Sequence, residues 1–272
     1  MASPTTDTTD ATDAPAKPRI GALYTVNAAK HYVDMLELSK QSLLKFHPDL
    51  PVKVVTLSAP TDIYERIRWF AGTRVERKLR KLFGSKGQAM ESRNACLAER
   101  LAVLADPPFE RTLFIDNDTV VVRPMDDLFD LAQNCDVVVQ TPKSGRKYPP
   151  IGEHYPKEMP ISNAGVYLFS KAFGQALAKA AADCPLDVTG LPDGDQFLFN
   201  QIVHGDSDLR VEFRDDLQEA NSPITDRPAL TSPEDAIADR DAGRKQTRVL
   251  HYTLRKRPWY TTLRKMFKAG KI

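Results

Sequence analysis

The strongest constraint on the fold is an apolar run at residues 113–122 that Asp116 and Asp118 interrupt. Apolar runs of this kind are typical of buried strands in α/β proteins. A buried ionised carboxylate costs free energy unless it is paired or coordinates a cation. Two carboxylates one residue apart, where a strand leaves the core, therefore predict a divalent cation that holds phosphate oxygens. The alternative is an ordinary strand-end turn with two solvated aspartates.

Length and charge indicate one folded domain with a polar start. A chain of 272 residues can bury one substantial core. Residues 1–18 have no large apolar side chain beyond Met1, so we predict a disordered tail followed by a single domain at residues 19–272. The formal net charge is only +2, and we expect no nucleic-acid partner.

The cysteines and the hydropathy pattern predict a cytoplasmic protein. Cys96, Cys135 and Cys184 are odd in number and lack the spacing of a metal site, which favours a reducing compartment. The start of the chain has neither the basic residues nor the apolar stretch of a signal peptide. No later apolar run is long enough to span a bilayer.

The order of predicted elements indicates an α/β fold. Strands at residues 19–25 and 52–57 flank an amphipathic helix at residues 28–46, and such a unit opens a parallel sheet. We predict further helices at residues 92–104, 124–131, 171–183 and 195–204. Further strands are predicted at residues 136–140, 161–170 and 249–252. Irregular segments are predicted at residues 145–160, as a loop flanking a site, and at residues 221–244.

Four separated segments carry a resemblance to a known family. They hold Asp116 and Asp118, then Asn163 and Gly165, then Asp195 and Gln196, and finally His251 followed by residues 257–259. With these motifs in this order, the chain resembles the GT-A glycosyltransferases, closest to the glycogenin-like retaining family, glycosyltransferase family 8. The resemblance spans residues 20–259 and implies a Rossmann-like, mostly parallel central sheet flanked by helices.

The resemblance implies a metal centre. Asp118 would ligate the metal directly, Asp116 would reach both the metal and the ribose, and His251 would be the third ligand. Two carboxylates and one imidazole suit Mn²⁺ and accept Mg²⁺. The alternative for His251 is a buried imidazole bonded to a main-chain carbonyl.

The resemblance also implies a catalytic set around the donor sugar. Asn163 would line the sugar, and Asp195 with Gln196 would lie near its anomeric carbon. Asp193 competes with Asp195 for this role, although an aspartate at that place also suits a helix cap.

Basic residues near the C-terminus are implied to contact the donor diphosphate. Arg257 stands where the family has a lysine, and a guanidinium can hold phosphate at two points. Lys256 and Arg255 add neighbouring charge. Leu254 stands where the family has a glycine, which bears on the close approach of the main chain to the phosphates.

Further donor contacts are implied at the end of the first strand, at the aspartate pair and on a preceding helix. Arg100 would face the donor, with Arg93 as the competing choice. Main-chain groups of the first strand could serve as well as its side chains. The remaining donor-binding residues are Tyr24, Thr25, Asn27 and Asn117.

The implied reaction is transfer of a hexose, from a UDP-sugar by family expectation, to a glycan or glycolipid acceptor with retention of configuration. Residues 258–272 form a basic amphipathic segment, with Trp259, Leu263 and Met266 on one helical side. Such a helix suits peripheral association with the inner face of an anionic membrane and a lipid-linked acceptor. The alternative is packing of its apolar side on the domain.

Three other functions fit part of the sequence. A haloacid dehalogenase-type phosphatase or phosphotransferase also places Asp-x-Asp-x-Thr after an apolar strand, and Asp215 with Asp216 could be its later acidic pair. Thr119 stands where that motif has glycine, and residues 120–122 continue as strand instead of opening into a loop. A non-catalytic sugar-nucleotide-binding protein and a nucleotidyltransferase are the others. The latter lacks a glycine-rich basic loop after the first strand.

Overall fold

The computed structural model describes most of the chain after the first nineteen residues. The described residues are 20–27, 30–57, 98–142, 147–151, 153–184, 194–205, 208–220, 233–252 and 257–272. The predicted tail at residues 1–18 and the first part of the helix predicted at residues 92–104 lie outside them. Residues 98–105 of that helix are helical.

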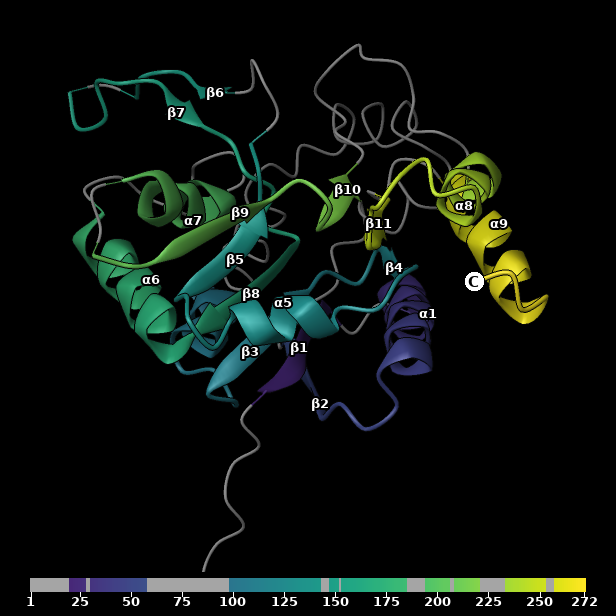
Figure 1. The fold of residues 1–272 in the computed structure, drawn as a ribbon. Helices are drawn as coiled ribbons and strands as arrows, with labels where there is room; N and C mark the ends of the chain where they lie inside the picture. The colour runs from purple at the N-terminus through teal and green to yellow at the C-terminus, as the bar shows by residue number, and fades with distance from the viewer. Residues whose placement is uncertain are drawn as a thin grey trace, which may run out of the picture.

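A six-stranded sheet forms the centre of the molecule, in the order β2-β1-β3-β8-β5-β9 (Figure 1). Its strands are β1 Ile20–Asn27, β2 Val52–Leu57, β3 Arg111–Ile115, β5 Val137–Gln140, β8 Val166–Ser170 and β9 Val211–Arg214. Within this sheet β8 runs antiparallel to both of its neighbours, whereas β2, β1 and β3 are mutually parallel, as are β5 and β9. The predicted α/β class with a mostly parallel central sheet is confirmed.

Helices cover both faces of this sheet because successive side chains of its buried strands point to opposite sides. Leu113 and Ile115 of β3 pack in one core cluster with α1 Lys30–Phe46 and α5 Asp126–Leu131. Phe114 packs in a second cluster with α6 Lys171–Asp183 and α7 Gly194–His204. The continuous apolar run of β3 is thus explained by burial on both faces.

A smaller, three-stranded sheet adjoins the central one, in the order β10-β11-β4. Its strands are β4 Thr119–Val121, β10 Gln218–Ala220 and β11 Val249–His251. The pairing of β11 with β4 is antiparallel and sets His251 opposite Thr119. The chain passes from the central sheet into the smaller one at the turn between β3 and β4, which carries the two predicted aspartates.

Some elements differ from the prediction. The loop predicted at residues 145–160 contains two short paired strands, β6 Lys147–Tyr148 and β7 Met159–Pro160. Strands β9 and β10 were not predicted, since they are short and of mixed polarity. The segment predicted to be irregular contains α8 Pro233–Asp241, whose proline and acidic residues in the first turn are helix-start signals.

The C-terminal helix, α9 Arg257–Lys268, packs on the domain. Leu263 and Met266 are 3% and 8% exposed and lie in a core cluster with Leu38 of α1 and Val120 of β4. Because this apolar side is already covered by protein, the predicted membrane association gains no support, and packing on the domain accounts for the amphipathic pattern. No helix among the described residues has the length and apolar character needed to cross a bilayer.

A buried histidine at the end of α1 makes stability depend on pH. The Met125 N–H donates to Nε2 of His47, 3.0 Å away, so this nitrogen must be unprotonated. Burial lowers the pKa of His47, and the nearby Asp126 carboxylate offsets this only in part. The unfolded chain therefore takes up a proton more readily. Neutral His47 therefore stabilises the folded state fully at pH values above the unfolded-state pKa of about 6.5. This stabilisation is lost as the pH falls through the lower pKa of the folded state.

We therefore expect the free energy of unfolding to fall between pH 7.5 and pH 5 by up to about 2 kcal/mol more in the wild type than in His47→Gln, the limit that proton linkage sets for one such group. The glutamine oxygen can accept the same N–H bond but does not titrate. Urea unfolding at several pH values measures the difference. Equal pH dependence in the two proteins would contradict the assignment.

Candidate functional site

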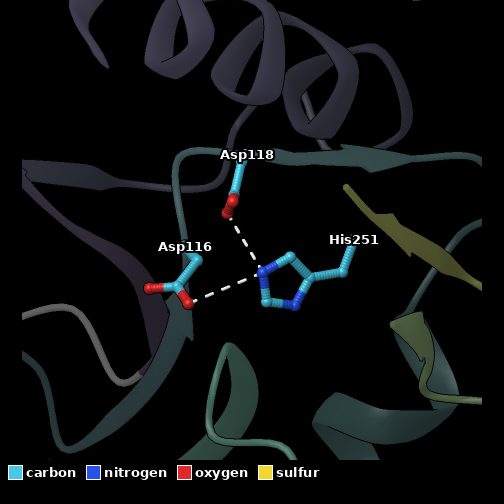
Figure 2. Close-up of side chains that lie close together, drawn as sticks. All are labelled: Asp116, Asp118 and His251. Carbon is cyan, nitrogen blue, oxygen red and sulfur yellow. Dashed lines mark hydrogen bonds and ion pairs between the residues drawn. The ribbon is translucent and has the colours of Figure 1, made fainter. Parts of the chain in front are cut away.

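Asp116, Asp118 and His251 lie together where the two sheets meet (Figure 2). Asp116 follows β3, Asp118 precedes β4, and His251 ends β11. One ligand atom from each lies within 4.8 Å of the other two. The His251 Nε2 is 3.0 Å from Asp118 Oδ1 and 3.7 Å from Asp116 Oδ2. Two carboxylate oxygens and an imidazole nitrogen so placed form a donor set for a divalent cation.

A directional chain of hydroxyl groups holds the turn between the aspartates. The Thr119 hydroxyl donates to the Asp116 carbonyl at 2.8 Å, and Ser39 Oγ lies 2.8 Å from Thr119 Oγ1. Each hydroxyl has one hydrogen, so Ser39 must donate to Thr119, and Tyr24 in turn to Ser39, at 3.2 Å. Ser39 of α1 and Tyr24 of β1 therefore help to fix the main chain that presents both carboxylates.

Gly165 allows the segment before β8 to approach the two aspartates and His251. Its carbonyl accepts the Asp116 N–H at 2.7 Å. A Cβ at this position would overlap the His251 ring, at 2.6 Å from Nδ1, and would lie 2.8 Å from Asp116 Oδ2. Glycine at position 165 therefore leaves the space in which Asp116 and His251 can approach each other.

Arg100 joins this centre to the predicted catalytic aspartate. Its Nη2 is 3.0 Å from Asp116 Oδ1, and its Nη1 is 3.2 Å from Asp195 Oδ2. The guanidinium also lies over the Phe114 ring, 4.7 Å from its centroid. Burial lowers the pKa of Arg100, but Asp116 and Asp195 raise it by more, so the cation is retained. The competing Arg93 lies outside the described residues.

The electrostatics of the centre favour bound positive charge. Burial raises the pKa of Asp116 to about 6, although Arg100 and His251 lower it. Burial also lowers the pKa of His251, but Asp118 and Asp116 raise it by more, so the net shift is upward. Both shifts favour the protonated form of the group, that is, a positive charge between the carboxylates and the imidazole. A metal ion at the same place would supply that charge.

The other two predicted catalytic residues lie against the segment that precedes β8. Asn163 Oδ1 accepts the Gly165 N–H at 2.8 Å. Gln196 Oε1 accepts the Ala164 N–H at 3.3 Å, and its Nε2 donates to the Tyr148 hydroxyl at 3.3 Å. The segment thus contacts the metal-ligand candidates on one side and α7 on the other.

Asn200 also holds this segment, and its role was not predicted. It is fully buried, accepts the Ser162 N–H at 2.6 Å and donates to the Ser162 carbonyl at 2.9 Å. It lies on α7, four residues after Gln196. The Asp-Gln motif therefore indicated a helix near the site, but it does not show what the Asn200 side chain touches.

The predicted nucleotide contacts on β1 have different positions. The Tyr24 side chain is fully buried toward α1, which leaves its main-chain groups for any ligand contact. The Thr25 carbonyl accepts from Asn117 Nδ2 at 2.9 Å, which ties β1 to the aspartate turn. The Oδ1 of Asn117 is buried and has no hydrogen-bond partner among the residues that the structure describes. Asn27 ends β1.

Several predicted contacts lie outside what the structure describes. These are the side chains of Asn27 and Arg257, together with residues Lys256, Leu254, Arg255 and Asp193. Arg257 is the first residue of α9.

Asp216, one of the acidic pair that a phosphatase would need, is bound by two arginines. The Asp216 carboxylate is bound by Arg214 Nε at 3.0 Å and by Arg248 Nη2 at 2.9 Å. Among the described residues, the only cluster of three or more potential His, Cys, Asp or Glu ligands is Asp116, Asp118 and His251. Asp216 is therefore explained by a structural ion-pair network.

No protein-family model matches the sequence, and no curated protein matches it either. Solved structures with a similar fold include the galactosyltransferase LgtC in complex with donor and acceptor sugar analogues, at 17% identity and a TM-score of 0.49. The alignment covers 93% of this chain and 100% of LgtC. The glycosyltransferase GlyE of Streptococcus pneumoniae and the bifunctional WbbM are similar at 15% and 13% identity, each with a TM-score of 0.48.

Each of these two alignments also covers 93% of this chain, but only 64% of GlyE and 52% of WbbM. The chain therefore spans about half to two thirds of the length of these two proteins.

We expect Gly165→Ala to weaken Mn²⁺ binding by at least about tenfold, because the added Cβ displaces His251 or Asp116 from the shared position. Calorimetric titration with Mn²⁺ measures the affinity. Gly174→Ala in α6 is the matched control, since its Cβ would lie 2.6 Å from the Leu104 carbonyl oxygen, in the core. The control should lose stability and keep its affinity. Unchanged Mn²⁺ binding in Gly165→Ala would contradict this account.

Proposed function

We propose that this protein is a metal-dependent glycosyltransferase of the GT-A type. It would transfer a hexose, from UDP-hexose by the sequence resemblance, to a glycan or glycolipid acceptor with retention of configuration. The observation that carries the proposal is the contact of His251 Nε2 with Asp118 Oδ1, 133 residues away in the chain. The sequence resemblance names these two residues and Asp116 as ligands of one metal, and their ligand atoms converge.

The donor set supports Mn²⁺, with Mg²⁺ as an alternative. Carboxylate oxygens suit both ions, and an imidazole nitrogen favours Mn²⁺. Three protein ligands leave coordination positions for diphosphate oxygens. When bound, such a cation would neutralise the negative charge on the departing nucleoside diphosphate.

The other residues of the site have proposed roles around the donor. Arg100 holds Asp116 and Asp195 in fixed orientations through its two guanidinium nitrogens. Asp195, Gln196 and Asn163 would orient the sugar so that an acceptor hydroxyl can approach its anomeric carbon. Asn117, whose buried Oδ1 has no hydrogen-bond partner in the described part of the chain, would lie near the nucleotide.

The proposal also includes contacts to the donor diphosphate and nucleoside, and a cellular compartment. Arg257 and Lys256 would contact the diphosphate. The main chain at Tyr24, Thr25 and Asn27 would receive the base and ribose. Action in the reducing cytoplasm is proposed from the odd number and the spacing of the cysteines in the sequence.

A thermal-shift panel of nucleotide sugars with and without Mn²⁺ tests the proposal. We expect a stabilising shift that requires both the metal and one particular donor, because each would bind only the folded protein. Mass spectrometry should show release of the matching nucleoside diphosphate over time. A binding protein without activity would give the shift and no product.

Asp118→Ala should abolish the metal-dependent shift and lower the rate of donor turnover at least about 100-fold, since a ligand for the charge-neutralising cation is removed. Asp130→Ala, which removes an exposed carboxylate on α5, is the control and should behave as the wild type. Full activity in Asp118→Ala, or activity that EDTA does not change, would refute metal-dependent transfer.

A further inference from the structure

Gln218 is a buried polar residue that contacts His251 from the side opposite to the aspartates. It lies in β10, beside β11, and is 2% exposed. Its side-chain Oε1 is 3.2 Å from His251 Nδ1. Its main-chain N–H donates to Gln140 Oε1 at 2.7 Å, which fixes the strand position from the neighbouring sheet.

The orientation of the Gln218 amide follows from its partners. Its Nε2 lies 3.0 Å from the Asn163 carbonyl oxygen and 3.1 Å from the Val166 carbonyl oxygen. Carbonyl oxygens only accept hydrogen bonds, so the end of the amide that faces them must be the NH₂ group. The amide oxygen therefore faces His251.

This orientation determines which His251 nitrogen carries a hydrogen. An amide oxygen can only accept, so Nδ1 must be protonated to donate to it. In a neutral imidazole, Nε2 then keeps its lone pair, and Nε2 is the nitrogen that faces Asp118 and Asp116 (Figure 2). The opposite tautomer would set the Nδ1 lone pair against the amide oxygen and would block Nε2 with a hydrogen.

We infer that Gln218 is a positioning residue that holds His251 as the Nδ1–H tautomer with Nε2 available to a divalent cation. This inference rests on the proposed function, since it assigns a role toward the proposed metal. Through its two other hydrogen bonds, the same amide fixes residues 163–166, which the proposal sets beside the donor sugar. One side chain thus links the imidazole ligand to the sugar-binding segment.

Nuclear magnetic resonance of the ¹⁵N-histidine-labelled protein with saturating Zn²⁺ tests the tautomer directly. Zn²⁺ is diamagnetic and accepts carboxylate and imidazole ligands. The His251 signals, assigned by their loss in His251→Asn, should show a hydrogen on Nδ1 and none on Nε2. A hydrogen on Nε2 would overturn the inference, whatever the metal affinity.

Titration with Mn²⁺ alone, without nucleotide, tests the energetic role. We expect Gln218→Leu to weaken Mn²⁺ binding by about 10–100-fold. Gln218→Glu should recover most of the affinity, because a protonated glutamate keeps an oxygen for the Nδ1–H and a hydroxyl for one carbonyl. The matched control is Ser170→Ala, which removes a buried hydroxyl that accepts the Phe173 N–H and donates to Asp136 but has no bond to Gln218 or His251. It should lose stability and keep its affinity within about threefold.

The outcomes separate this inference from the proposed function. Wild-type protein that binds no Mn²⁺, or binding that Asp118→Ala leaves unchanged, would overturn the proposed metal centre and the basis of the inference with it. Binding that is lost in Asp118→Ala but unchanged in Gln218→Leu would overturn the role of Gln218 alone.

Discussion

Asp116 is the residue on which the arrangement of the site depends, because burial makes its negative charge costly. Burial raises its pKa to about 6, and the compensating charges come from elements far apart in the chain. Arg100 reaches it from the helix at residues 98–105 and also binds Asp195 on α7. His251 approaches from β11. The partners required by this one carboxylate therefore bring together the elements that carry the other site residues.

The sheets supply the geometry that these charges need. The chain leaves the central sheet after β3 and enters the smaller sheet at β4, so the aspartate turn lies at the junction. The hydroxyl chain from Tyr24 through Ser39 and Thr119 fixes this turn against α1. Ser42 of α1 also accepts the Val121 N–H of β4 at 2.9 Å, so a buried hydroxyl of the helix supplies a partner for the main chain of the smaller sheet.

Part of the fold and of the site could be predicted from short stretches of the sequence. Carboxylates inside an apolar run are costly enough to predict a partner, and α6 begins and ends where the apolar periodicity predicts it. The strand β10 is three residues long and has no pattern of its own. Gln218 was missed for that reason, since its partner His251 is 33 residues away. Gly165 was found as part of a motif, but its necessity depends on a ring from β11 that no local pattern reveals.

The balance of charge explains why we propose a cation at Asp116 and Asp118 and none at Asp216. Asp216 has two guanidinium partners, from Arg214 and Arg248, and needs nothing further. At the junction of the sheets, Asp116 and Asp195 share the single guanidinium of Arg100, and Asp118 faces only the His251 imidazole among the ion pairs described. Three carboxylates and one guanidinium leave two negative charges when His251 is neutral, as the Gln218 contact allows. A divalent cation would balance that charge, and the coordination positions left open by the three protein ligands would be available to diphosphate oxygens.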